Sequence, residues 1–193
     1  MLTKRLYTAE DLVAMGNEDY ELIDGELREV SPAGGDSSRV GALLLGHLMH
    51  FNEEYELGEV FGADGGFVLS RVPLILVAPD VSFVRAENIP PDYDFRPFFP
   101  GAPDFAAEVR SPTDRPGALE EKVERLLTFG TKLVWKADPN LRLVEVRRRG
   151  RPPQTLYMGD VLDGEDVIPG FRLPVARIFR EPRRRHAAIR QPE

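Results

Sequence analysis

The segment from residue 104 to 137 constrains the fold of this chain most. Residues 104–110 alternate like a strand, 118–129 have the apolar spacing of a helix closed by Gly130, and 132–137 form a second strand pattern. A strand–helix–strand unit of roughly 30 residues normally has parallel strands and a right-handed crossover. The sequence therefore predicts an α/β fold, with a mixed sheet flanked by helices.

The N-terminal part is predicted to begin with a short helix and a hairpin. Thr8 and Asp11 have the spacing of a capping box, and Gly16 follows the short apolar run after them. Asp24-Gly25 lies between two β-like runs and favours a tight turn.

A longer helix and further strands follow. Apolar residues have helical spacing from Val40 to about Leu57, after a loop in which Asp36 or Ser37 is the expected cap. Residues 89–103, rich in proline and aromatic side chains, are predicted to form an irregular loop. Other strand patterns occur at 59–69, 72–84, 143–149 and 155–158, with a turn at Asp163-Gly164. We expect one domain over residues 1–180 and a basic, mobile tail over 181–193.

Composition excludes several classes of protein. Cysteine is absent, so the chain has no disulfide framework, thiolate nucleophile or cysteine metal site. No segment approaches the run of about 18 apolar residues that spans a bilayer, and the N-terminus lacks the apolar core of a signal peptide. We therefore expect a soluble, cytoplasmic protein without a membrane segment.

The net charge of -7 at pH 7 argues against a non-specific nucleic-acid coat protein, which is usually basic. The charge is unevenly distributed, because residues 1–108 hold 7 basic and 20 acidic side chains whereas residues 109–193 hold 18 and 12. The second part alone therefore has a charge balance suited to contacts with phosphates.

Two carboxylates and one lysine are expected to converge on the strand–helix–strand unit. Asp80 follows Pro79 within an apolar run, and Glu108 lies inside the strand 104–110, where an acid is out of keeping with β propensity. Lys122 lies at the margin of the apolar helix face, so its ammonium group can reach over the strand that carries Glu108.

Such a group suits the hydrolysis of a phosphodiester. Carboxylate oxygens bind Mg²⁺, which polarises the phosphoryl oxygen and lowers the pKa of a bound water. A lysine can orient that water or stabilise the developing charge. The same residues allow a purely structural interpretation, in which Pro79-Asp80 is a turn and Glu108 and Lys122 form a salt bridge. Spacing alone leaves both interpretations open.

Several short motifs, in order along the chain, resemble the bacterial Uma-two family of endonucleases, within the PD-(D/E)XK superfamily of restriction-type nucleases. They are YELIDGEL at 20–27, Ser31-Pro32, APDVSFV at 78–84, Pro103-Asp104, EVRSPT at 108–113, Glu121-Lys122, Trp135, Asp138-Pro139 and LDGEDVIPGF at 162–171. The resemblance covers about residues 7–179 and implies a restriction-endonuclease-like core.

The resemblance also implies roles for single residues. Asp80 and Glu108 match the two acids of the superfamily motif and would hold Mg²⁺, or Mn²⁺ in its place, together with the Val109 carbonyl. Arg110 stands where the motif has lysine, and Lys122 on the following helix is the matching lysine.

Two further positions follow from the resemblance. The N-terminal glutamate that assists the metal would be Glu21, with Glu26 as the second choice. Relatives commonly have a histidine in the loop before the long helix, where this chain has Ser37, so any role of that histidine in substrate handling is in doubt here.

Other motifs point less strongly to chemistry. His47 and His50 lie one turn apart, with Glu54 one turn further on, but such a pair without another strong ligand is usually a solvated or core-edge feature. The glycines at 62–66 lack the following helix of a nucleotide-binding loop. Ser111 has no partner for acyl transfer and suits a loop or a helix entry.

Arginines of the second half are candidates for phosphate contacts, although a charge run is more often a solvated face. They are Arg110, Arg147, Arg148, Arg149, Arg151 and the run 183–185. Trp135 and the aromatic residues of loop 89–103 are expected in the core or at a subunit contact rather than as base-stacking platforms.

The leading hypothesis is a Mg²⁺-dependent endonuclease that acts on DNA and forms a homo-oligomer. In it, Asp80, Glu108 and Val109 hold the metal and Lys122 orients the attacking water. The alternative is a catalytically inactive nuclease-like module that binds nucleic acid or assembles with itself, since a fold does not guarantee its chemistry. A metal-dependent hydrolase of small phosphoesters is a third possibility.

Overall fold

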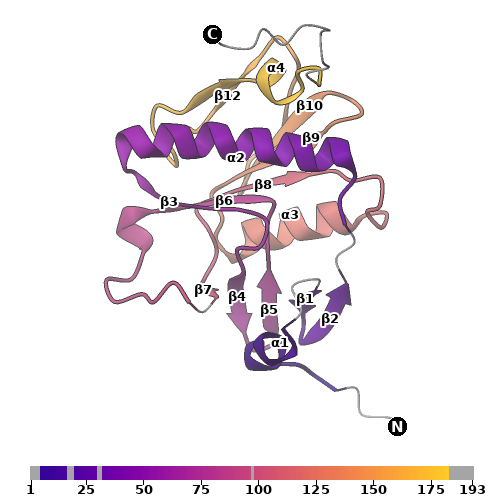
Figure 1. Cartoon of the computed structure of the whole chain (residues 1–193), viewed down its shortest axis with the longest axis vertical. Helices are drawn as coiled ribbons and strands as arrows, with labels where there is room; N and C mark the ends of the chain where they lie inside the picture. The colour runs from indigo at the N-terminus through magenta and orange to yellow at the C-terminus, as the bar shows by residue number, and fades with distance from the viewer. Residues whose placement is uncertain (1–4, 17–19, 30–31, 97, 183–193) are drawn as a thin grey trace, which may run out of the picture.

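The computed structural model describes residues 5–16, 20–29, 32–96 and 98–182. Within these residues the chain forms a six-stranded sheet, a five-stranded sheet, a two-stranded hairpin and α-helices on both sides of the larger sheet (Figure 1). The predicted α/β fold, a mixed sheet flanked by helices, is confirmed.

The six-stranded sheet has the strand order β11-β10-β9-β8-β6-β3. Its strands are β3 (Gly58–Phe61), β6 (Val81–Arg85), β8 (Phe105–Val109), β9 (Leu133–Asp138), β10 (Leu143–Arg148) and β11 (Gln154–Leu156). Within this sheet as described, β8 and β9 pair in parallel and the other neighbours are antiparallel. Because α3 (Ala118–Phe129) connects β8 to β9, the predicted strand–helix–strand unit is present, with helix bounds as predicted.

The five-stranded sheet has the order β2-β1-β5-β4-β7 and lies at the far side of α3 from α2 (Figure 1). Its strands are β1 (Tyr20–Ile23), β2 (Glu26–Glu29), β4 (Phe67–Arg71), β5 (Leu74–Val77) and β7 (Phe99–Pro100). Asp24 and Gly25 both adopt positive φ, 54° and 75°, between β1 and β2. This is the backbone that a two-residue hairpin turn requires, so the predicted hairpin is confirmed.

Alternate residues of β8 and β9 point to opposite faces of the six-stranded sheet. Phe105 and Trp135 belong to the core beside α2 (Gly35–Tyr55), whereas Ala106 and Val134 pack with the apolar face of α3. That face consists of Val123, Leu126 and Leu127, as predicted. Since side chains along a strand alternate with period two, Glu108 shares the α3 side of the sheet with Ala106.

The C-terminal elements cover the outer side of α2. They are β12 (Val161–Asp163), β13 (Arg172–Pro174) and α4 (Val175–Ile178). Leu162, Ile168 and Ile178 from this region are fully buried in the same core as α2. The α2 side of the sheet is thus closed by apolar packing, and polar chemistry is left to the α3 side.

The first helix, α1 (Ala9–Met15), has the predicted capping box. The Asp11 amide donates to Thr8 Oγ1 at 3.1 Å and the Thr8 amide donates to Asp11 Oδ2 at 2.9 Å. Gly16 ends the helix in the left-handed conformation.

The start of α2 differs from the prediction. It begins at Gly35 after Gly34, so the expected caps, Asp36 and Ser37, lie inside the helix. The Gly34 amide donates instead to Ser111 Oγ at 3.2 Å, and Ser37 Oγ donates to the Arg110 carbonyl at 2.7 Å. Contacts with the loop after β8 therefore replace local capping, and no local sequence signal marks such a contact.

The loop predicted over 89–103 is irregular except for the two residues of β7, and it follows a 3-10 turn (Ala86–Asn88). Phe99 and Trp135 are buried in the core, as expected, whereas the Phe95 side chain is 54% exposed. Of the predicted tail, residues 183–193 lie outside the described part of the chain. In the part that is described, no helix is both long and apolar enough to cross a membrane.

Two glycines make a matched test of the packing. A Cβ on Gly58 would lie 2.0 Å from the Val84 carbonyl oxygen, whereas nothing lies within 4 Å of one on Gly46, inside α2. We expect Gly58→Ala to reduce the free energy of unfolding by about 3 kcal/mol, and Gly46→Ala to raise it by roughly 0.5–1 kcal/mol because alanine is the better helix former. Urea unfolding of both variants measures this, and equal effects would contradict the backbone contact at Gly58.

Candidate active site

Strand register brings Asp80 beside Glu108. In the antiparallel pair of β6 and β8, Val81 lies opposite Ala107 and Ser82 opposite Ala106. One further step of the same register places Asp80, at the start of β6, opposite Glu108. Facing residues of a sheet point to the same side, so both carboxylates lie on the side that α3 covers.

Lys122 of α3 is the hub of the polar contacts. Its Nζ lies 2.8 Å from Glu21 Oε1, 3.1 Å from Glu108 Oε1 and 2.8 Å from the carbonyl oxygen of Ala78. The contact with Glu108 is an ion pair without the alignment of a hydrogen bond. The structure thus brings together Glu21 from the smaller sheet, Glu108 from the larger sheet and Lys122 from the helix.

The Pro79-Asp80 turn is held from both sides. Glu21 Oε1 accepts the Ala78 amide hydrogen at 3.1 Å while Lys122 donates to the Ala78 carbonyl. Asp80 Oδ2 accepts the Val109 amide hydrogen at 2.7 Å. Sequence reasoning did not single out the Ala78 peptide, because a backbone group leaves no side-chain signal. The predicted role of the Val109 carbonyl stays a prediction.

Burial dominates the electrostatics of the two acids. The Glu108 side chain is 4% exposed, and this desolvation raises its pKa well above the ordinary value, against the attraction of the Lys122 ammonium. Burial also raises the pKa of Asp80, although Lys122 and the Val109 amide oppose the shift. The surrounding carboxylates of Glu108, Glu21 and Asp80 outweigh burial at Lys122 and raise its pKa, so Lys122 stays protonated.

The group lines a cavity of about 580 Å³ between the hairpin β1–β2, the turn at 78–80, the loop after β8 and α3. Charged residues of its wall include Glu21, Arg28, Asp80, Glu108, Lys122 and Arg125. Sequence analysis missed Arg28 and Arg125. The hairpin signal would have found Arg28, because a two-residue turn at Asp24-Gly25 pairs Glu21 with Arg28, as observed.

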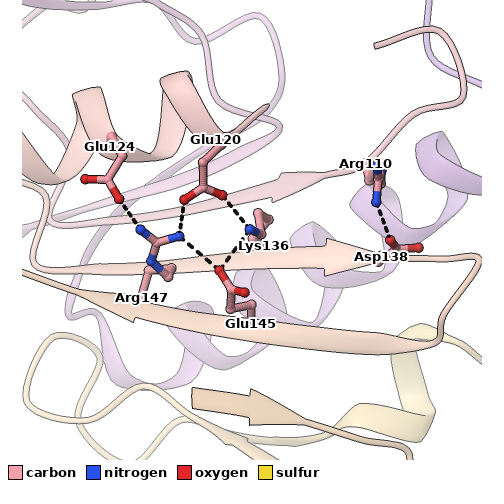
Figure 2. Close-up of polar contacts among 7 residues, drawn as sticks. All are labelled: Arg110, Glu120, Glu124, Lys136, Asp138, Glu145 and Arg147. Carbon is pink, nitrogen blue, oxygen red and sulfur yellow. Dashed lines mark hydrogen bonds and ion pairs between the residues drawn. The ribbon is translucent and has the colours of Figure 1, made fainter. Parts of the chain in front are cut away.

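The arginines predicted to contact phosphates are mostly engaged with carboxylates. Figure 2 shows Arg147 of β10 directed toward Glu120 and Glu124 of α3, with Glu145 beside it. Lys136 of β9 bridges Glu120 and Glu145 at 2.6 and 2.8 Å, a pairing that sequence reasoning also missed. This cluster ties α3 to β9 and β10 over the face that carries Glu108.

The neighbouring arginines differ in whether they form ion pairs with described residues. Arg148 binds Glu165, with Nε 2.6 Å from its carboxylate, and Arg110 binds Asp138 at 3.1 Å (Figure 2). Arg149 is exposed and has no ion-pair partner among the described residues. Arg149 is therefore the member of the run 147–149 that is available to a ligand without breaking an ion pair.

The described part of the chain holds no group of three or more histidine or acidic side chains arranged around one point as ligands. His47, His50 and Glu54 thus form no such set among the described residues. Of the site acids, Glu21 is directed to Lys122 and Ala78. Asp80 Oδ1 and Glu108 Oε2 accept no hydrogen bond from described residues.

Comparison with known proteins agrees with this architecture. The solved structure of a protein described as "a putative nuclease belonging to DUF820", from Anabaena variabilis, is similar with a TM-score of 0.78 at 18% sequence identity, over 89% of this chain and 97% of that one. At this identity the likeness shows the fold. No curated protein matches the chain. The family model Uma2, described as "Putative restriction endonuclease", matches residues 9–176, so the chain belongs to the Uma2 family of restriction-endonuclease-like nucleases.

Proposed function

We propose that this protein is a Mg²⁺-dependent endonuclease that hydrolyses phosphodiester bonds in DNA. One observation carries the proposal: the carboxylates of Glu21 and Glu108, from two different sheets, contact a single protonated lysine, and Asp80 lines the wall of the same cavity. The family to which the chain belongs supports a nucleic-acid substrate.

The residues of the site fit a divalent cation. Glu21, Asp80 and Glu108 carry three negative charges when ionised, and Lys122 supplies one positive charge, so the group has an excess of two negative charges. Burial holds the pKa of Asp80 and of Glu108 above its ordinary value, the sign of carboxylates that lack enough positive charge. Asp80 Oδ1 and Glu108 Oε2 are the free oxygens, and hard oxygen ligands are those that Mg²⁺ prefers.

In this proposal Asp80 and Glu108, with the Val109 carbonyl, would hold the metal, which when bound would supply Lewis-acid activation of the phosphoryl group and of a water. Mn²⁺ is the expected substitute. Lys122 cannot accept a proton near neutral pH, because its pKa is raised, so it acts as a donor. It orients the attacking water or stabilises charge on the phosphoryl oxygens. Glu21 holds Lys122 in place through the 2.8 Å ion pair.

The structural interpretation of the same residues, a salt bridge and a turn, accounts for the contact between Lys122 and Glu108. It does not account for the gathering of three acidic side chains, those of Glu21, Asp80 and Glu108, beside a single lysine on the wall of one cavity. This excess of buried acid favours the enzyme over an inactive binding module.

Cleavage of supercoiled plasmid tests the proposal. We expect nicking with Mg²⁺ or Mn²⁺ and none with EDTA. Asp80→Asn is expected to lower the rate about a hundredfold, because the amide keeps the size of the side chain but is a poorer metal ligand. The control is Asp64→Asn, which removes a carboxylate that lines the same cavity but forms no ion pair with Lys122, and it is expected to leave the rate within about twofold.

Three outcomes separate the alternatives. DNA retention without metal-dependent cleavage would identify the inactive module, and hydrolysis confined to small phosphoesters would identify the third class. Equal rates for wild type and Asp80→Asn would contradict the assigned metal ligand. Light scattering, which measures the molar mass in solution, tests the proposed homo-oligomer independently of cleavage.

A further inference from the structure

Two arginines on the cavity wall have no carboxylate partner among the residues that the structure describes. Arg28 of β2 and Arg125 of α3 both line the cavity that contains Lys122. Neither forms an ion pair or hydrogen bond with any described side chain. Arg115, on the same wall, is different, because it binds Glu121 at 2.8 Å.

These two arginines flank the pair formed by Glu21 and Lys122. Arg28 lies directly across the hairpin from Glu21, so the two side chains leave the same face of the smaller sheet. Arg125 lies three residues after Lys122, hence nearly one turn further along the same side of α3. The cavity wall thus has a free guanidinium group next to each partner of the central ion pair.

Two acids of the same wall, Glu21 and Glu121, make their contacts with other groups. Glu21 Oε1 contacts both Lys122 and the Ala78 amide, and Glu121 is engaged with Arg115. A guanidinium group offers five donors in a planar fork that matches a phosphate. Arginines that stay unpaired on a concave wall are therefore available for an anion that the chain itself does not supply.

We infer that Arg28 and Arg125 form a phosphate subsite, which binds a backbone phosphate of the nucleic acid next to the one that reacts at Asp80 and Glu108. The inference rests on the proposed function for the identity of the ligand, a polynucleotide. It places the phosphate contacts with the substrate on the cavity wall and not on the run 147–149, where Arg147 and Arg148 bind carboxylates.

Equilibrium binding tests this without any chemical step. The probe is a fluorescein-labelled single-stranded DNA of about 16 nucleotides in EDTA, titrated at low salt and followed by fluorescence anisotropy. We expect Arg28→Ala/Arg125→Ala to weaken binding at least about tenfold. Because about 0.7 counterion is released per phosphate contact on a single strand, the slope of log K against log salt should fall in magnitude by about 1.4.

Two single-arginine variants serve as matched controls. Arg71→Ala removes an exposed arginine outside the cavity, and Arg149→Ala removes the free arginine of the run 147–149. Both are expected to bind within about twofold of wild type. Circular dichroism of each variant checks that the fold is retained.

Each result decides the inference separately from the proposed function. Selective weakening in the double variant supports the subsite, even if no cleavage is found and the enzyme proposal fails. Plasmid cleavage by wild type, with binding by the double variant equal to that of Arg71→Ala, overturns the subsite and leaves the enzyme. Loss of binding in Arg149→Ala alone, or no binding by wild type at about 50 mM salt, also overturns the subsite.

Discussion

Lys122→Met should lose cleavage and stability together. The methionine keeps an unbranched side chain but removes the charge that contacts Glu21, Glu108 and the Ala78 carbonyl. We expect plasmid cleavage to fall about a thousandfold, since a donor to the developing phosphoryl charge is lost. We also expect the free energy of unfolding at pH 7 to fall by about 3 kcal/mol, because buried carboxylates are left without their partner.

The direction of the pH effect follows from the pKa of Lys122, which is raised in the folded protein. A raised lysine pKa contributes stability that is complete below the unfolded value of about 10.4 and is lost as pH rises through the folded value. The full contribution is therefore present at pH 7, where the unfolding experiment is made. Lys132→Met is the control, because Lys132 is half exposed and its pair with Asp104 is screened by solvent.

A double variant separates the chemical role of Lys122 from its structural role. The Lys122→Met change leaves buried carboxylates without a partner, and Glu108→Gln/Lys122→Met removes one of them. The double variant should therefore recover part of the lost stability without recovering cleavage. Recovery of cleavage, or a Lys122→Met enzyme as active as Lys132→Met, would contradict the role assigned to the ammonium group.

Glu108→Gln should abolish metal-dependent cleavage while leaving the fold at least as stable near neutral pH. Glutamine keeps the shape of the buried side chain but cannot supply an anionic oxygen to Mg²⁺. We expect at least a thousandfold loss of cleavage. We also expect Mg²⁺ to raise the melting temperature of wild type and not that of the variant, since a ligand that binds the folded state stabilises it.

The melting temperatures should diverge with pH. The pKa of Glu108 is raised in the folded state above its unfolded value of about 4.3, so stability present below that value is lost as pH rises toward the folded pKa. Glutamine does not titrate, so the melting temperature of the variant relative to wild type should increase as the pH rises above about 4.3, the unfolded value. Mg²⁺ must displace a proton from Glu108, so its apparent affinity for wild type should weaken on acidification.

Glu121→Gln is the matched control for this series. It removes a carboxylate that lines the same cavity but is about half exposed and pairs with Arg115. Its cleavage, its Mg²⁺-dependent stabilisation and its pH profile are expected to match those of wild type. A thermal shift by Mg²⁺ that persists in Glu108→Gln would place the metal elsewhere in the protein.

The part of the site that was predictable lies in one short stretch of chain. Period-two alternation in 104–110 and helical spacing in 118–129 placed Glu108 and Lys122 on elements joined by a short turn. A parallel crossover must then fold that helix onto the strand. The apolar face of the helix predicts which side of it packs on the sheet, and Lys122 lies at the margin of that face. The contact between Lys122 and Glu108 therefore follows from the periodicity of these two segments and the crossover.

The start of α2 and the pairing of Arg147 were not predictable in this way. Gly34 and Ser37 bind the loop after β8, more than 70 residues away in the chain. Arg147 meets Glu120 and Glu124 only because β10 lies beside β9 under α3. A local window contains neither partner, so the arginine run looked free to bind phosphate.

By itself, the sequence determined the strand–helix–strand unit, the hairpin at Asp24-Gly25 and, through the family resemblance, the choice of Glu21. Only the tertiary structure decided that Glu21 shares Lys122 with Glu108, that the Ala78 peptide is held between Glu21 and Lys122, and that Arg28 and Arg125 border one cavity. The physical reason is range. Backbone periodicity and turn chemistry act over a few residues, whereas the site joins two sheets and a helix whose approach is set by the packing of the core.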